Sequence, residues 1–139
     1  MAFIKVKGDT VGKNYFPTQR LLREEDILLV VSFADVVEIR IKMHEQNKKG
    51  TNFFLCEETL EEIQSKLKNK TNFILLNENK KFGGGERYLI NKKYVMAVKE
   101  RKDVMSVYVK DGFYCKGKIE SEILFCEESL DKILAMLNE

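Results

Sequence analysis

The feature that most constrains this chain is an internal duplication. The segment FLCEETLEEIQSKL at 54–67 aligns with LFCEESLDKILAML at 124–137, at an offset of 70 residues. Identical residues recur at Cys56 and Cys126, Glu57 and Glu127, Glu58 and Glu128, Leu60 and Leu130, Ile63 and Ile133, and Leu67 and Leu137. Upstream, Phe3-Ile4 matches Phe73-Ile74, and after a two-residue slip Leu21-Leu22 matches Leu89-Ile90 and Asp35-Val36 matches Asp103-Val104. The 139 residues therefore read as two copies of one unit, 1–70 and 71–139.

Both copies predict the same series of elements. The predicted strands are FIKVKG at 3–8, RLL at 20–22, DILLVVSF at 26–33, VVEIRIKM at 36–43 and NFFLCE at 52–57, with counterparts FILLNE at 73–78, RYLI at 87–90, YVMAVKE at 94–100, VMSVYVKD at 104–111 and EILFCE at 122–127. A helix follows the last strand of each copy, because residues such as Leu60, Ile63 and Leu67 recur at the i, i+3, i+7 spacing of one buried stripe.

These elements predict an α+β fold of two tandem units, each an antiparallel sheet of about four or five strands followed by one C-terminal helix. The join at 68–72 has no Ser- or Gly-rich linker, so we expect a turn there and two copies packed as one compact body. One helix covers only one face of a sheet. The copies should therefore bury their remaining apolar surface against each other with pseudo-twofold symmetry, as a homodimer would.

Three cysteines and one histidine predict neither a metal site nor a disulfide framework, and we expect no cofactor. Cys56, Cys115 and Cys126 are too far apart for the C-x-x-C spacing that places two thiolates on one metal ion. Cys56 and Cys126 each lie in an apolar run, where a thiol packs as a small buried hydrophobe. His44 has no second histidine and no nucleophile motif beside it, so we expect it on the surface.

No enzymatic motif is present. The glutamate pairs at 57–58 and 127–128 open the predicted helices, where carboxylates favour the positive end of the helix dipole, so we interpret them as helix chemistry and not as catalytic acids. The loop at 8–13 lacks the glycine spacing, the hydroxyl and the following helix of a phosphate-binding loop, and with the glycines at 83–85 it predicts hairpin turns. No nucleophile, base and orienting group can be assembled, which predicts a non-enzymatic protein.

The sequence also predicts a cytoplasmic protein without a membrane partner. No apolar run approaches the roughly 18 residues that a membrane span needs. Met1 leads directly into the strand-like run at 3–6 and not into a signal peptide.

Positive charge is concentrated in the second copy, outside its helix. The whole chain carries a net charge of only +2, but residues 68–126 hold 13 basic residues against 7 acidic ones. Phe82, Tyr88 and Tyr94 are interleaved with these cations, a mixture that tracks a nucleic-acid backbone and stacks bases. The candidate nucleic-acid contacts are Lys80, Lys81, Arg87, Tyr88, Lys92, Lys93, Lys99, Arg101 and Lys102.

Two functions remain open at this point. The leading hypothesis is a nucleic-acid-binding protein that prefers single-stranded DNA or RNA. The alternative is a structural or assembly protein, as from a phage or other mobile element, whose sheet edges pair with copies of itself or with a protein partner. A continuous positive groove lined by exposed rings favours the first, whereas scattered lysines and buried rings favour the second.

The copies differ in charge at one equivalent turn. Asn91-Lys92-Lys93 in the second copy replaces Arg23-Glu24-Glu25 in the first. We therefore expect the second copy to bind and the first mainly to support it. Replacing Lys92 and Lys93 by Glu should abolish nucleic-acid binding with the fold intact, and replacing Glu24 and Glu25 by Lys should strengthen it.

The second copy, RYLINKKYVMAV followed by an alternating strand, a polar turn and LFCEESLDKIL, resembles the FlbD family of small flagella-associated proteins. The positions that carry this resemblance are Asn91, Val95, Val98, Glu128, Ser129 and Leu130. The helix TLEEIQSKL followed by Phe73 is similar to LytTR DNA-binding domains, although a glycine loop replaces that family's basic-histidine segment. The order of strands followed by a helix, which occurs twice in this chain, resembles that of the Whirly and Pur-alpha type single-stranded DNA binders. These resemblances imply tandem β-rich repeats, and the last three imply nucleic-acid binding.

Overall fold

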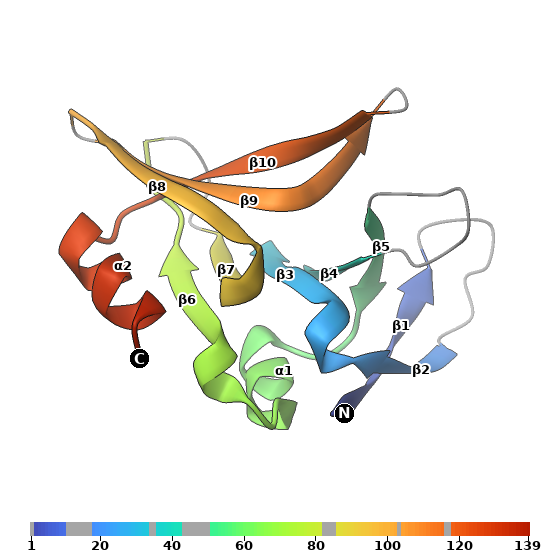
Figure 1. Cartoon of the computed structure of the whole chain (residues 1–139). Coiled ribbons are helices and arrows are strands. Elements are labelled where there is room, and N and C mark those ends of the chain that lie inside the picture. The colour runs from blue at the N-terminus through green and yellow to red at the C-terminus, as the bar shows by residue number, and fades with distance from the viewer. Residues whose placement is uncertain are drawn as a thin grey trace.

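The structure, a computed structural model, describes residues 2–10, 18–33, 36–42, 51–81, 86–102, 104–115 and 118–139. Within them the chain has the predicted α+β character, with strands in two sheets and two short helices beside them (Figure 1). The hairpin glycines at 12 and 83–85, His44 and Phe82 lie outside the described residues. No helix in the described ranges has the length and apolar character needed to cross a membrane.

The strands of the first half are β1 (Phe3–Thr10), β2 (Thr18–Arg23), β3 (Ile27–Phe33), β4 (Val36–Lys42) and β5 (Thr51–Cys56), followed by the helix α1 (Leu60–Lys66). The second half contains β6 (Phe73–Asn77), β7 (Arg87–Asn91), β8 (Val95–Arg101), β9 (Val104–Cys115), β10 (Lys118–Cys126) and α2 (Leu130–Leu137). Every predicted strand run forms a strand, and the order of elements is the same in the two halves. Three short 3-10 helices were not predicted: η1 (Glu24–Asp26), η2 (Lys70–Asn72) at the join, and η3 (Lys92–Tyr94).

One sheet runs through both halves. Its strand order is β2-β1-β5-β4-β3-β7-β6, and a second sheet has the order β10-β9-β8. The strand pairs described by the structure are antiparallel, as predicted. The sequence predicts one sheet for each copy, whereas the larger sheet contains strands of both halves. β3 of the first half pairs with β7 of the second, with Leu29 opposite Ile90 and Ser32 opposite Arg87.

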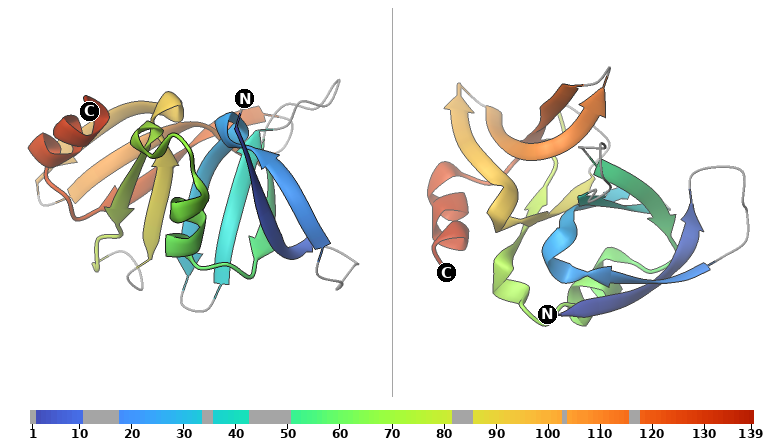
Figure 2. Two further views of the ribbon diagram at one scale, coloured as in Figure 1. Left: turned by 90° about the horizontal axis from the view of Figure 1, so that it is seen from below. Right: turned by 45° about the vertical axis from the view of Figure 1, so that its right-hand side comes forward.

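The join between the halves is head to tail. β7 has the place in the second half that β2 has in the first, and β3 has the place of β8. A twofold contact that paired β3 with β7 would also pair their equivalents, β8 with β2, because each contact then occurs twice. β8 and β2 instead end different sheets. The predicted pseudo-twofold packing is therefore wrong. In Figure 2 the elements follow one another in a row, with α2 at one end and the β1–β2 hairpin at the other.

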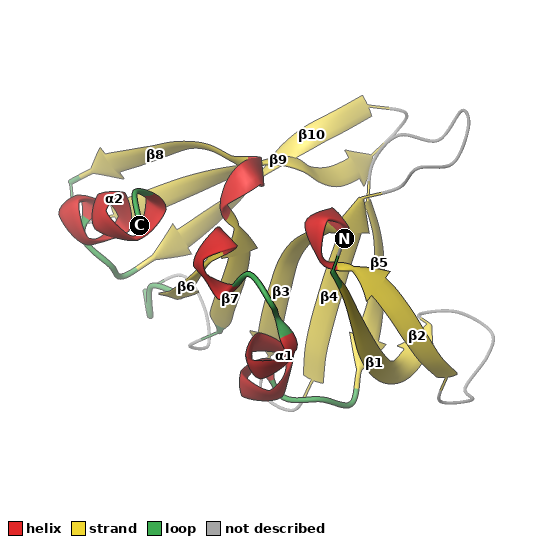
Figure 3. Cartoon of the chain, turned by 60° about the horizontal axis from the view of Figure 1, so that its bottom comes forward, coloured by secondary structure: helices red, strands yellow, loops and turns green. Residues whose placement is uncertain are grey.

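Two apolar clusters meet at this join, and β3 contributes to both. Val30 packs in the first cluster, whereas Leu28 and Val31 pack in the second. Both faces of β3 are buried, which explains why its sequence is continuously apolar and does not alternate. In return, Phe73 and Leu89 of the second half pack in the first cluster. The helices complete the clusters: α1 packs against β1 and β3, and α2 packs against β8 (Figure 3).

The sheet divides between β6 and β10, at a position where the two halves differ. In the first half, residues 8–10 of β1 pair with 54–56 of β5. Their equivalents in the second half meet in a single bridge between Glu78 and Cys126. A Cβ at Gly8 would lie 2.1 Å from the carbonyl oxygen of Leu55, so only glycine permits this approach. Glu78 stands at the place of Gly8 in the second half, and the pairing there is limited to that bridge.

Candidate binding surfaces

The duplicated Cys-Glu-Glu segments form a hydrogen-bonded turn between the last strand of each half and its helix. The Glu58 carboxylate accepts the backbone N–H of Lys7 at 2.7 Å. The Glu128 carboxylate accepts the backbone N–H of Asn77 at 3.0 Å and the Asn77 side-chain amide at 2.8 Å. The second glutamate of each pair thus fastens the first strand of its half. This differs from the predicted helix-dipole role and explains why both copies keep a glutamate there.

The helices begin two residues after these glutamates, and the residue in between caps each helix. The Thr59 hydroxyl accepts the backbone N–H of Glu62 at 3.1 Å, and the Ser129 hydroxyl accepts that of Lys132 at 3.2 Å. A hydroxyl at this position satisfies one of the N–H groups that a helix leaves unpaired at its start. The correspondence of Thr59 with Ser129 in the sequence therefore reflects the same capping chemistry in the two copies.

The described cysteines are buried thiols, as predicted. Burial raises the pKa of the Cys56 thiol to about 12 and that of the Cys126 thiol to about 11, and the neighbouring carboxylates of Glu58 and Glu128 act in the same direction. Such a thiol carries almost no thiolate at neutral pH, so neither is suited to nucleophilic chemistry. The Cys115 side chain lies outside the described residues. Among the side chains that the structure describes, no three His, Cys, Asp or Glu residues are grouped to hold a metal ion.

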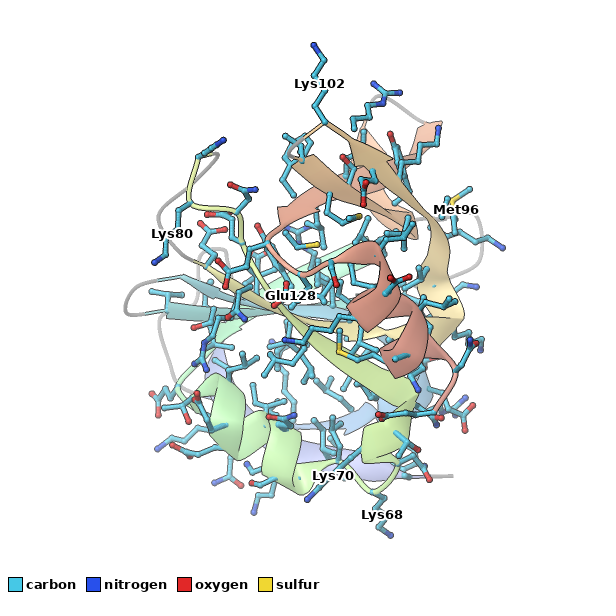
Figure 4. All side chains as sticks on the ribbon, turned by 90° about the vertical axis from the view of Figure 1, so that its left-hand side faces the viewer. Lys68, Lys70, Lys80, Met96, Lys102 and Glu128 are labelled. Carbon is cyan, nitrogen blue, oxygen red and sulfur yellow. The ribbon has the colours of Figure 1, made fainter. Side chains whose placement is uncertain are left out.

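Part of the predicted cationic set lies on β8 and the turns beside it. The exposed members there are Lys80, Lys81, Lys99, Arg101 and Lys102. The turn after β6 and the turn between β8 and β9 adjoin, because Asn79 and Lys102 line one shallow pocket. In Figure 4 Lys80 and Lys102 lie toward one end of the molecule, and Lys68 and Lys70 lie at the other, with the buried Glu128 between them.

Arg87 and Tyr88 do not belong to this surface. Arg87 forms an ion pair with Glu61 of α1, and the guanidinium holds the pKa of that carboxyl below its usual range. Tyr88 is buried in the second cluster, and its hydroxyl donates a hydrogen bond to Glu78 Oε2 at 2.6 Å. The predicted stacking role of Tyr88 is wrong, because a ring in the core presents no face to a base.

A carboxyl pair beside Tyr88 was missed by sequence reasoning. Glu78 and Glu86 lie just beyond the paired ends of β6 and β7, and the Glu78 N–H donates to the Glu86 carbonyl at 2.8 Å. Burial, together with the nearby Glu78 carboxylate, raises the pKa of the Glu86 carboxyl. The two residues are separated by the loop at 82–85, so their spacing in the sequence carries no signal of this pairing.

Lys92 and Lys93 lie in η3, just before β8, and line a different pocket from Lys102. Together with η1 they line a polar cavity of about 210 Å³, bounded by Glu24, Glu25, Asn69, Asn72, Phe73, Asn91, Lys92 and Lys93. Glu24 is buried, and its carboxylate accepts the backbone N–H groups of Lys68 and Asn69 at 3.1 and 2.9 Å. The expected gain in binding from lysine at both 24 and 25 needs correction, because Lys at 24 would break this link between η1 and the segment after α1.

Exposed apolar side chains gather at the two ends of the row of strands. Phe3 and Leu21 are exposed at the β2 end, beside an open groove of about 560 Å³. Met96 on β8 and Leu130 and Leu134 on α2 are exposed at the opposite end. β2 and β8 each end a sheet, so among the described strands each has a neighbour on one side only. Sequence reasoning did not find these exposed apolar side chains. The signal available was the alignment of equivalent apolar positions in the two copies.

Comparison of this chain with models of protein families, with curated proteins and with solved structures gives no match. The resemblances to FlbD, LytTR, Whirly and Pur-alpha proteins therefore stay predictions.

Proposed function

We propose that this chain is a non-enzymatic assembly protein that associates with further copies of itself through its outer strand edges. The observation that carries the proposal is the coincidence of terminal strands with exposed apolar side chains at both ends of the molecule. A terminal strand presents a row of N–H and C=O groups with which another strand can pair. Apolar side chains beside that strand supply the area whose removal from water drives the association.

The burial of the aromatic rings also favours assembly over nucleic-acid binding. Phe73, Tyr88 and Tyr94 are buried in the two apolar clusters. Lys99 lies over the ring of Tyr108, with its Nζ 5.0 Å from the ring centre, so that ring is partly covered by a cation of its own chain. Surfaces that bind single strands offer open ring faces to successive bases. These described rings are instead used for packing.

The halves of the chain are, in this proposal, two copies of one structural unit. Two observations support this interpretation: the same order of elements, and the same hydrogen bonds donated by the backbone N–H groups of Lys7 and Asn77 to the carboxylates of Glu58 and Glu128. The two copies of the unit already pair with each other within one chain. The same kind of contact is therefore suited to form between copies in different chains.

The size of the protein in solution tests the proposal. Sedimentation velocity over a dilution series from about 1 μM to about 1 mM should show association that grows with concentration. The double variant Leu21→Glu with Met96→Glu should remain monomeric, because charges then replace exposed apolar groups at both ends. Val36→Glu changes an exposed apolar residue of β4, a strand with neighbours on both sides, and is the matched control. A monomeric wild type at all concentrations, or a double variant that associates like the wild type, contradicts the proposal.

Nucleic-acid binding is the second candidate function. One observation favours it: the exposed cations of the second half lie on β8 and on the turns that adjoin it. Phosphate contacts by these lysines would position a strand without reading its sequence.

A salt-dependent titration with single- and double-stranded oligonucleotides tests this candidate. Replacing Lys80 and Lys81 by Glu should lower the salt slope by about one for each phosphate that these lysines bind in the wild type. Replacing Lys68 and Lys70 by Glu changes the same charge at the opposite end and should leave the slope unchanged. Equal affinity of both double variants and the wild type would refute the candidate.

A further inference from the structure

The strands that join the two halves have equivalents that, among the described strands, have a neighbour on one side only. With the two-residue slip of the duplication, β3 corresponds to β8 and β7 corresponds to β2. β3 and β7 pair with each other, whereas among the described strands β8 and β2 each end a sheet. One end of the molecule, at β8, therefore repeats the β3 side of the internal join. The other end, at β2, repeats the β7 side.

The inserting side of the join shows this difference in its apolar side chains. Leu89 and Phe73 of the second half pack in the first cluster and are 1% and 7% exposed. Their equivalents, Leu21 and Phe3, are 70% and 49% exposed. The residue types are the same, and only the packing of other residues against them differs.

The receiving side shows the same difference. Leu28 of β3 is fully buried, whereas Met96, its equivalent on β8, is 60% exposed. Leu60 of α1 is 1% exposed, whereas Leu130, its equivalent on α2, is 40% exposed. α1 packs against β3 and α2 packs against β8, so the helix and strand that receive the second half are present again in the same relation.

We infer that β2 of a second copy of this chain adds to β8, in the register with which β7 pairs with β3. Val98 then lies opposite Leu21, as Val30 lies opposite Leu89 within the chain. Phe3 and Leu21 of the added copy cover Val98 of β8 and the exposed Leu130 of α2, because Phe73 and Leu89 pack with the equivalents of those residues in the first cluster. This inference rests on the proposed assembly function and gives it a geometry. Because the contact joins two different surfaces, it leaves one of each open and builds a ring or a filament.

The register also predicts an unusual response to salt. It places Lys99 opposite Arg20, where the internal join has Val31 opposite Tyr88. Like charges that face each other across paired strands oppose the pairing. Salt screens that repulsion, so assembly should strengthen as salt is added, whereas nucleic-acid binding should weaken. Lys99→Glu should tighten assembly by about threefold or more, because a carboxylate then faces Arg20.

Mixing two single variants tests the head-to-tail geometry. Leu21→Glu blocks the inserting end and Leu130→Glu blocks the receiving end, and both residues are exposed, so we expect the fold to be retained. Each variant alone should be monomeric in sedimentation velocity, because every contact needs one end of each kind. An equimolar mixture should form a heterodimer that grows no further. Val36→Glu, on a strand inside the sheet, should assemble like the wild type.

The other outcomes separate the inference from the proposed function. If one single variant still forms dimers while the other does not, the edges bind but pair with their own kind, which overturns the head-to-tail inference and leaves assembly in place. If the mixture contains only monomers while the wild type assembles, the inference is also overturned. A wild type that is monomeric throughout overturns both.

Discussion

Removing the buried Glu128 carboxylate should lower the free energy of unfolding by about 3 kcal/mol. Its oxygens accept the backbone N–H of Asn77 at 3.0 and 3.1 Å and the Asn77 side-chain amide at 2.8 Å. Hydrogen bonds to a charged group contribute about 1.5–3 kcal/mol each, and relief from burying the carboxylate offsets part of that sum. Glu128→Ala would leave the Asn77 N–H without its acceptor at the start of the turn that fastens β6 to β10. Urea unfolding followed by circular dichroism at pH 7 measures the loss.

The chain supplies its own controls for this prediction. Glu58→Ala removes the equivalent bonds to Lys7 in the first half and should cost a similar amount. Glu57→Ala and Glu127→Ala remove exposed carboxylates next in sequence and should change the free energy of unfolding by less than about 0.5 kcal/mol. If Glu128→Ala falls within that range, or if Glu127→Ala destabilises as much, the assigned role of the second glutamate is refuted.

Three further predictions concern packing and protonation. Gly8→Ala should destabilise the fold by about 2–3 kcal/mol in urea unfolding, because its Cβ would meet the Leu55 carbonyl oxygen at 2.1 Å; unchanged stability would contradict the tight β1–β5 approach. The raised pKa of Glu86 beside Glu78 means that the folded state holds a proton more tightly than the unfolded state, so stability should fall as pH rises above the ordinary value of 4.5; the urea midpoint of Glu86→Gln should depend less on pH, and equal pH slopes would count against it. The Cys126 thiol, with its pKa raised to about 11, should resist alkylation at pH 8 until the protein unfolds, and fast labelling mapped by mass spectrometry would disprove its burial.

The strands, helices and their repetition could be predicted because their signals are local. Alternating apolar residues identify each strand, and the i, i+3, i+7 stripe identifies each helix. The Cys-Glu-Glu segments with Thr59 or Ser129 align because each residue has the same local role: a buried thiol, a strand-fastening carboxylate and a helix cap. The role of the carboxylate was misread, since the backbone that it binds lies about fifty residues away in the sequence.

The contacts between halves could not be predicted, because they depend on which edge meets which. Leu21 and Leu89 are the same residue in the same local pattern, and only the pairing of β7 with β3 decides that one is exposed and the other buried. The candidate site was affected in the same way. Tyr88 follows Arg87 in a basic segment, but the register of β6 and β7 turns its ring into the core, where Glu78 accepts its hydroxyl.

Hydrogen exchange of the backbone amides, measured by NMR at several protein concentrations, tests most directly the claim that the outer edges repeat the internal join. Amides at 29–32 in β3 lie between β4 and β7 and should exchange slowly at every concentration. The amides at 97–100 in β8 and at 19–22 in β2 that point away from β9 and β1 should exchange quickly in dilute protein and become protected together as the concentration rises. Protection of these two edges that does not change with concentration, while the protein is shown to associate, would contradict the account.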